Sequence, residues 1–348
     1  AALYKARSSA RIVEVRKPAV AGAAKEQRPK TLAETMEDVF LRDFEPSVTI
    51  PGLQPAALAV ADAESEDERQ LGVSQLGVTV AQPESGSLRP TLIIGLGTFG
   101  RKAIMELRCR FLDRFGDLGK LPLLRFLYLD VDPEAQQFIG YGSPQVAMSR
   151  NDFYPLPLQP VVNYRRKSLD RLSEWLPRDK LYGMPRSLQT QGSRSLGRLA
   201  FSDHQQRLVA RLRREIQEIT HPDTIYKSVE STGLALISNT PRIYVISAAG
   251  GGASGMLADL GYALRRLTDT LRFPDAKVVS FLMCGAAQDP ATPKHEMANV
   301  YATLTELNHF SDSSISFSAE YGADGQRIVD EGMPYHAVYL LPLAHRSP

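Results

Sequence analysis

Hydrophobic and polar residues follow two alternating patterns from residue 89 onward. Short apolar runs, typical of buried strands, are separated by longer stretches in which apolar residues recur every three or four positions, typical of helices. The apolar runs lie at 91–94, 123–129, 242–248 and 277–283, with two further runs at 314–318 and 337–341. The helical stretches lie at 98–115, 196–219, 254–271 and 292–310. This alternation predicts an α/β fold with a doubly wound, mostly parallel sheet and helices on both faces.

One stretch inside this region breaks the alternation. Residues 153–191 are rich in proline and contain Trp175, the only tryptophan of the chain. We expect an insertion here, with a short helix near 169–175. The sequence shows no internal repeat.

Residues 1–88 differ in composition from the rest of the chain. Alanine, proline, glutamate, serine and glycine accumulate, and aromatic residues are scarce. Such a composition buries too little apolar surface to offset chain entropy, which predicts a low-complexity extension, disordered or docked, rather than a domain. Within it, 31–44 opens with the capping-box pattern Thr31-Leu32-Ala33-Glu34 and carries apolar residues at helical spacing. This segment predicts a short helix that docks on the main domain or binds a partner.

Composition narrows the class of protein only a little. The chain has 348 residues, 43% hydrophobic and 23% charged, with a formal net charge of +2 at pH 7. These values fit a soluble globular protein and do not indicate a nucleic-acid partner. Cys109 and Cys284 lie far apart within apolar patterns, which favours a reduced, cytoplasmic setting. No apolar run reaches the roughly 18 residues of a membrane span. Because the chain starts at Ala1 and stops at Pro348, soon after a strand-like run, we expect it to be part of a longer polypeptide.

Two glycine-rich segments stand where a predicted strand meets a predicted helix. They are Gly95-Leu96-Gly97-Thr98-Phe99-Gly100 and Gly250-Gly251-Gly252-Ala253-Ser254-Gly255. Each can turn backbone N–H groups and a helix N-terminus toward a phosphate. In the first, we expect Gly95 to permit a tight turn, Gly97 to allow close approach of a phosphate, and Gly100 to let the helix pack on its strand. Together the segments predict one domain that holds a polyphosphate nucleotide between them; glycines that serve packing alone are the alternative.

Two carboxylates close the second predicted strand. Asp130 and Asp132 stand at the edge where open α/β sheets bind ligands, and beside a polyphosphate they fit Mg²⁺, which takes one or two protein oxygens. Asp132 can instead cap the next helix, with Pro133 in its first turn, and both roles are compatible. An NAD-type Rossmann site is an alternative. It expects a ribose-binding acid about 20 residues after the glycines, whereas Asp130 comes 30 residues after Gly100.

These motifs, in this order, resemble those of the tubulin and FtsZ superfamily, and within it the divergent bacterial tubulin-like proteins. Residues 125–133 are similar to the tubulin segment in which an acidic pair precedes a proline. The second glycine segment resembles the signature GGGTG[ST]G. In this register Ala249 replaces the first glycine, Gly252 the threonine and Ala253 the fourth glycine, while Ser254 and Gly255 match. The resemblance covers about 89–343 and implies a tubulin-like nucleotide-binding domain over 89–348.

The resemblance also implies a ligand, GTP or GDP with Mg²⁺, the metal lying on Asp132 and Asp130. Residues 192–198 are similar to the FtsZ loop over the terminal phosphate. Arg194 or Arg198 would then meet this phosphate, unless it lies on the helix surface. Glu296 and Asn299 stand where the superfamily contacts ribose and base, although both residue types are also common helix caps. The implied contact residues are Gly95, Gly97, Thr98, Phe99, Asp130, Asp132, Gly192, Arg194, Arg198, Gly250, Gly251, Gly252, Ala253, Ser254, Gly255, Glu296 and Asn299.

The function implied by the resemblance is guanine-nucleotide binding by a protein that assembles head to tail and hydrolyses GTP at the subunit junction. In the superfamily, the acid that positions water follows a long central helix, and we expect this chain to stop before that helix and the activation domain. Residues 1–348 alone are then nearly inactive as a GTPase. Two alternatives remain. A dinucleotide-binding Rossmann domain leaves the second glycine segment unexplained, and a non-catalytic scaffold would carry a pocket that has decayed.

Overall fold

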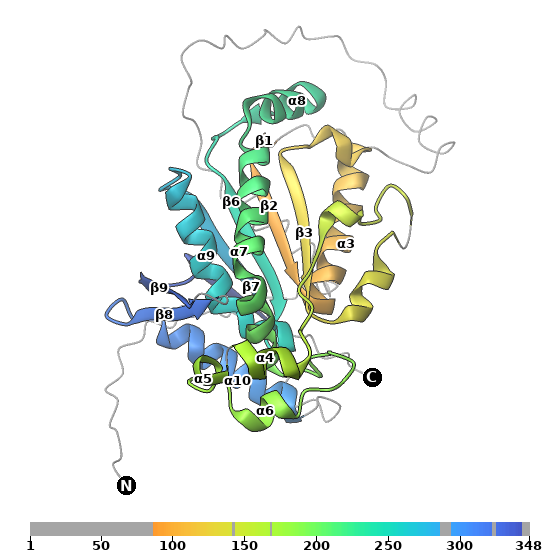
Figure 1. The fold of residues 1–348 in the computed structure, drawn as a ribbon. Helices are drawn as coiled ribbons and strands as arrows, with labels where there is room; N and C mark the ends of the chain where they lie inside the picture. The colour runs from red at the N-terminus through yellow and green to blue at the C-terminus, as the bar shows by residue number, and fades with distance from the viewer. Residues whose placement is uncertain (1–85, 141–142, 168, 286–293, 322–324, 343–348) are drawn as a thin grey trace, which may run out of the picture.

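The computed structural model describes residues 86–140, 143–167, 169–285, 294–321 and 325–342. A six-stranded parallel sheet forms the centre of this part of the chain (Figure 1), in the order β10-β7-β6-β2-β3-β4. The strands are β2 (Thr91–Leu96), β3 (Leu124–Asp130), β4 (Phe153–Pro155), β6 (Arg242–Ala248), β7 (Lys277–Cys284) and β10 (Ala337–Pro342). The predicted α/β fold with a mostly parallel sheet is confirmed.

Helices cover both faces of the sheet. Successive residues of a strand point to opposite faces, so Leu92 packs toward α7 (Arg194–Ile219) and α9 (Leu257–Thr270), whereas Ile93 packs toward α3 (Gly97–Phe115). In Figure 1, α7 passes in front of the central strands. Because the central strands are buried on both faces, their sequences are continuous apolar runs rather than alternating ones.

The Pro-rich stretch 153–191 is only partly the insertion that we expected. It begins with β4, which pairs with β3 in parallel and forms an edge of the sheet. Three short helices follow, α4 (Val161–Lys167), α5 (Leu169–Leu172) and α6 (Arg178–Tyr182). A three-residue strand ending in proline carries too little periodicity to be recognised from sequence, and proline is tolerated there because β4 is an edge strand.

Near the C-terminal end, α10 (Lys294–His309) precedes a hairpin of β8 (Ser316–Tyr321) and β9 (Gln326–Glu331). The predicted strand at 314–318 therefore starts later, and it pairs antiparallel with β9 outside the main sheet. Several small elements were also not expected. They are β1 (Ser87–Leu88), β5 (Ala235–Leu236), α8 (Pro222–Thr232) and the 3-10 helices η1 (Leu118–Lys120), η2 (Pro133–Phe138) and η3 (Arg150–Asp152).

The predicted helix at 31–44 and most of the predicted N-terminal extension lie outside the described residues. The boundary at residue 88 therefore stays a prediction. Of the helices that the structure describes, none is both long enough and apolar enough to cross a membrane.

Candidate functional site

A cavity of about 440 Å³ opens at the carboxyl ends of the central strands. Residues from both glycine segments, the end of β3, the loop before α7 and the start of α10 line it. The structure thus brings together most of the predicted contact residues. Those that line the cavity are Gly97, Thr98, Phe99, Asp130, Asp132, Gly192, Gly250, Gly251, Gly252, Ala253 and Glu296.

The first glycine segment joins β2 directly to α3, and its glycines differ from expectation in their roles. Gly97 makes the turn, with a backbone φ of +66° that favours glycine. Gly95 is not a turn residue but lies in β2. A Cβ atom on Gly95 would stand 2.6 Å from the Gly100 carbonyl oxygen, and one on Gly100 would stand 2.5 Å from the Gly95 carbonyl carbon. These two glycines therefore allow α3 to pack closely on its strand.

The start of α3 faces the cavity without a side-chain cap. Leu96 is the N-cap residue and offers no hydrogen-bonding side chain, and the first turn contains no acidic residue. The backbone N–H groups of a helix's first turn lack partners within the helix, and their positive end of the helix dipole attracts anions. Lys102, which sequence reasoning did not select, also lines the cavity and adds a positive charge. Its place two residues after Gly100 was the available signal.

The second glycine segment leads from β6 into the 3-10 helix η4 (Gly252–Met256) and then into α9. Gly251 is the N-cap of η4 and again provides no side-chain cap. Its backbone is extended, with φ −82° and ψ 162°, and an added Cβ would find its nearest neighbour at 3.8 Å, the Ala248 carbonyl oxygen. Gly251 is therefore a glycine of the cavity wall that has open space beside it.

The next glycines of this segment serve packing against the start of α7. A Cβ on Gly255 would stand 1.9 Å from the Arg194 carbonyl oxygen, and one on Gly197 would stand 2.1 Å from the Gly252 carbonyl oxygen. Gly252 still lines the cavity, whereas Gly255 does not. The close contact of η4 with α7 thus requires glycine on both elements.

Ser254 and Arg194 also belong to this packing rather than to the cavity lining. Ser254 is fully buried, and its hydroxyl donates to the Gly251 carbonyl at 2.7 Å. The Arg194 guanidinium donates to Ser254 Oγ at 3.1 Å and pairs with Glu306 of α10. The predicted contact of Arg194 with a terminal phosphate is therefore not supported by its placement.

One face of α10 holds the two loops beside the cavity. Asn299 Nδ2 donates to the carbonyl oxygens of Gly192 at 2.7 Å and Gly250 at 2.8 Å. One turn later, the buried Thr303 hydroxyl donates to the Ala249 carbonyl at 2.9 Å. Asn299 was predicted to reach a base, but its amide hydrogens bond to backbone and it does not line the cavity.

The two carboxylates after β3 have different environments. Asp130 is 7% exposed, accepts a hydrogen bond from the Tyr128 hydroxyl, and accepts another from the Asp132 N–H at 3.0 Å. Burial raises the pKa of Asp130 above its ordinary value, although these hydrogen bonds oppose the rise. Asp132 is more accessible. Both oxygens of Asp130 are thus engaged within the protein, which leaves Asp132 as the better metal ligand.

Asp132 occupies the N-cap position of η2 but does not cap it through its side chain. Its Oδ1 instead accepts hydrogen bonds from the Thr190 N–H at 2.8 Å and the Thr190 hydroxyl at 3.2 Å. The capping alternative for Asp132 is therefore wrong. Thr190 lines the cavity and was not predicted, because it reaches Asp132 only through a loop in which Leu188 and Gln191 have positive φ angles.

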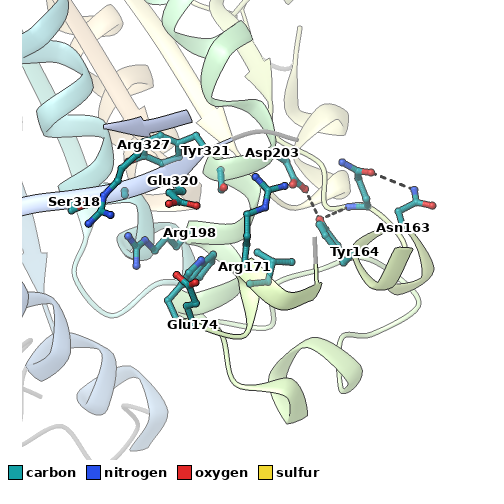
Figure 2. Close-up of a pocket in the computed structure, with 15 residues that line it drawn as sticks. Asn163, Tyr164, Arg171, Glu174, Arg198, Asp203, Ser318, Glu320, Tyr321 and Arg327 are labelled. Carbon is teal, nitrogen blue, oxygen red and sulfur yellow. Dashed lines mark hydrogen bonds between the residues drawn. The ribbon is translucent and has the colours of Figure 1, made fainter. Parts of the chain in front are cut away.

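Arg198 lies in a different place from its predicted one. Its Nε pairs with the buried Asp259 carboxylate at 3.3 Å, and its guanidinium stacks 4.8 Å from the centre of the Trp175 ring. Figure 2 shows it in a second groove, of about 500 Å³, between the α4–α5 region and the β8–β9 hairpin. The Tyr321 hydroxyl donates to the same carboxylate at 2.6 Å. Arg198 therefore ties α7 to α9 and does not reach the glycine-lined cavity.

A metal at the cavity would need ligands beyond the protein. No cluster of three or more His, Cys, Asp or Glu side chains suited to a metal ion occurs in the described ranges. Asp132 offers a carboxylate, and Mg²⁺ commonly binds through one or two carboxylates together with substrate phosphates. The donor set thus fits a metal that arrives with a polyphosphate rather than a resident structural ion.

The comparisons with known proteins agree with this architecture. A family model described as "Tubulin like" matches residues 92–345. A search of curated proteins finds no match to the chain. The matched region contains both glycine segments, Asp130 and Asp132, and α10, so the resemblance inferred from these motifs is confirmed. Because the match spans more than half of the 348 residues, the chain belongs to the tubulin-like family.

Proposed function

We propose that the chain binds a guanine nucleotide, GTP or GDP, together with Mg²⁺ in the glycine-lined cavity. The observation that carries this proposal is the convergence of two uncapped helix starts, α3 and η4, on one cavity that also contains Asp132 and Lys102. Helix N-termini bind phosphate through backbone N–H groups. Tubulin-like proteins generally bind GTP, which identifies the nucleotide class.

Each group around the cavity has a distinct chemical part in the proposal. The N–H groups at 97–99 and 251–253 would bind phosphate oxygens, and Lys102 would balance their charge. Asp132 would hold Mg²⁺, which neutralises phosphate charge when bound. Glu296, exposed in the first turn of α10, would accept from the ribose hydroxyls.

The NAD-type alternative receives less support. A Rossmann site uses the acid at the end of the second strand to bind the ribose, and Asp130 has that position in β3. The Tyr128 hydroxyl and the Asp132 N–H already occupy the two oxygens of Asp130. Asp130 is therefore a poor ribose ligand here, and no observation favours the dinucleotide over a mononucleotide.

Self-assembly belongs to the same proposal. We infer that copies associate head to tail and that GTP is hydrolysed where one copy's cavity meets the next copy. The support is family membership, because tubulin-like proteins often self-assemble. The backbone donors and Lys102 would stabilise charge on the transferred phosphoryl group.

A binding titration tests the nucleotide and the metal together. Fluorescent GTP is titrated into the protein in Mg²⁺ and in EDTA, with unlabelled GDP, ATP and NAD as competitors. We expect competition by GDP but not by NAD. Asp132→Asn should weaken binding about tenfold in Mg²⁺ and leave binding in EDTA unchanged, because the amide can still accept from Thr190. Glu134→Gln, which alters an exposed carboxylate that contacts Gln189, is the matched control. Displacement of the label by NAD, or equal binding of wild type and Asp132→Asn in Mg²⁺, would contradict the proposal.

A further inference from the structure

A small apolar groove lies at the opposite end of the sheet from the glycine-lined cavity. It has a volume of about 120 Å³ and adjoins the first residues of β2, β3 and β6. Leu88, Phe115, Leu121, Leu123 and Leu234 form its base. A groove of this size accepts one or two apolar side chains, which suits the edge of an amphipathic helix better than a separate ligand.

The charge around this groove has one sign. Among the described residues that line it, those with charged side chains are Arg89, Arg114 and Arg242. The proposed nucleotide cavity, in contrast, contains carboxylates as well as Lys102. An apolar floor with an arginine rim complements a segment that combines apolar and acidic residues.

The chain itself brings such a segment to this place. Gly86 and Ser87, where the described part of the chain begins, line the groove. Residues 1–85 therefore enter the domain at its rim. In 31–44, Leu32, Met36, Val39 and Phe40 fall on one side of a helical projection, and Glu34, Glu37 and Asp38 fall on the other side.

We propose that residues 31–44 of the same chain dock as a helix in this groove, with Phe40 or Val39 filling the apolar base and the acidic residues facing the arginine rim. About 40 residues separate this segment from Gly86, and a flexible chain of that length spans roughly 35 Å on average. The tether keeps the segment at a millimolar effective concentration. A weak contact is then enough to keep the groove occupied.

This inference is independent of the proposed nucleotide binding, because the groove and the cavity lie at opposite ends of the strands. The docked segment would cover α3, η1 and β5 without closing the cavity. It also differs from docking on β10, where Val338, Tyr339 and Leu340 expose 37–49% of their surface. That edge offers an apolar face but is not where residues 1–85 join the domain.

Photo-crosslinking in the full chain tests the location. Phe40→p-benzoylphenylalanine keeps an aromatic ring at the proposed anchor, and irradiation followed by peptide mapping identifies its neighbour. We expect crosslinks within one chain to 86–91, 111–124 or 234–242. The same photo-reactive residue at Leu53, outside the amphipathic segment, should give none of these. Crosslinks from position 40 to 337–341, crosslinks between two chains, or no crosslink above the Leu53 control would each overturn the proposal.

Hydrogen exchange provides a second measurement that does not depend on crosslinking chemistry. Phe40→Asp should speed amide exchange about tenfold in 31–44 and at the groove, while leaving the central strands protected. Leu53→Asp is the matched control and should change neither region. Nucleotide titrations on the same variants should match the wild type. Unchanged exchange in Phe40→Asp at both the segment and the groove would overturn the docking.

Discussion

Single glycines around the cavity serve two physical purposes. Gly95, Gly100 and Gly255 let backbones approach where a Cβ atom would overlap with a neighbour. Gly251 has an ordinary extended backbone and free space beside it, so its missing side chain matters only to what enters the cavity. Substitutions at these two kinds of glycine should therefore affect different measurements.

We predict that Gly251→Ala weakens GTP binding about tenfold and leaves stability within about 0.5 kcal/mol of the wild type. The added methyl group fits the protein but stands in the cavity wall, where a phosphate is proposed to approach. Gly119→Ala, at an exposed glycine whose nearest neighbour is the Asp117 carboxylate at 3.1 Å, is the control. Fluorescence titration and chemical denaturation measure the two quantities. Wild-type affinity in Gly251→Ala would place the phosphates elsewhere.

Gly97→Val is a less informative variant, although sequence alone favours it. At φ +66°, a β-branched residue strains the backbone by about 1–2 kcal/mol or more. Lost binding would then reflect a distorted turn as well as a blocked phosphate. Its predicted loss of affinity stands, but an intact fold cannot be assumed for it.

The same contrast explains what could be predicted at single residues. Gly97, Asp132 and the 250–253 run follow strands, so local sequence placed them at the cavity. Arg198 carries no local sign of its pairing with Asp259, which is 61 residues away in sequence. Thr190 reaches Asp132 through a loop whose course depends on left-handed residues, so it too was hidden.

At the scale of elements, α10 is predicted to organise the cavity from outside it. Asn299→Ala removes two hydrogen bonds to the loop carbonyls of Gly192 and Gly250, which should cost about 1–3 kcal/mol of stability. Because these loops form opposite walls, nucleotide affinity should fall as well. Asn308→Ala, at an exposed position of the same helix, is the control. Denaturation and titration of both variants decide the matter, and an Asn299→Ala protein indistinguishable from Asn308→Ala would refute the role.

The junction of α4 with α7 predicts a pH dependence of stability. Burial raises the pKa of Asp203 to about 6, although the Tyr164 hydroxyl donates to its carboxylate and opposes the rise. The folded state thus binds this proton more tightly than the unfolded state. The Asp203 contribution is fully present below about pH 4 and is lost as pH rises toward 6.

Asp203→Asn removes that titration, and its stability relative to the wild type should rise between pH 4 and pH 6, by at most about 3 kcal/mol. Asp170→Asn, at an exposed carboxylate of α5, should show no such trend. Urea denaturation at several pH values gives the comparison. A constant difference between Asp203→Asn and the wild type across this range would contradict the assignment.

Long elements with strong periodicity were predictable, and short ones were not. The predicted strand at 242–248 and the predicted helix at 196–219 coincide with β6 and nearly with α7, because both bury continuous faces. β4 has three residues, and β9 alternates too weakly to be recognised. The hairpin of β8 and β9 packs through Phe317 and Tyr321 on α7 and α9, a tertiary contact that local pattern does not encode.

At the scale of the whole molecule, the sheet separates two ends with different chemistry. The carboxyl ends of the strands carry the glycine-lined cavity, and the amino ends carry the arginine-rimmed groove. The order of strands and glycine segments was enough to predict the fold and the family. It was not enough to predict catalysis, which depends on groups that must be oriented around a bound nucleotide.

Three carboxylates line the cavity in the part of the chain that the structure describes, Asp130, Asp132 and Glu296. Tyr128 and the Asp132 N–H bind Asp130, Asp132 is the proposed metal ligand, and Glu296 is the proposed ribose contact. None of them remains to orient an attacking water. In the superfamily that this chain resembles, a neighbouring subunit supplies the acid for this step.

We therefore predict that purified residues 1–348 hydrolyse GTP at close to the uncatalysed rate, with turnover per molecule independent of protein concentration. Bound phosphate is neutralised by backbone donors, Lys102 and Mg²⁺, but an unoriented water forfeits a large part of phosphoryl-transfer catalysis. Phosphate release at rising protein concentration, with nucleotide binding verified in the same samples, is the measurement. Rapid hydrolysis that needs Mg²⁺ would show that the chain contains its own catalytic acid. Glu296→Gln and Asp132→Asn would then identify it, because only the variant that lacks the acid would lose turnover while still binding GTP in EDTA.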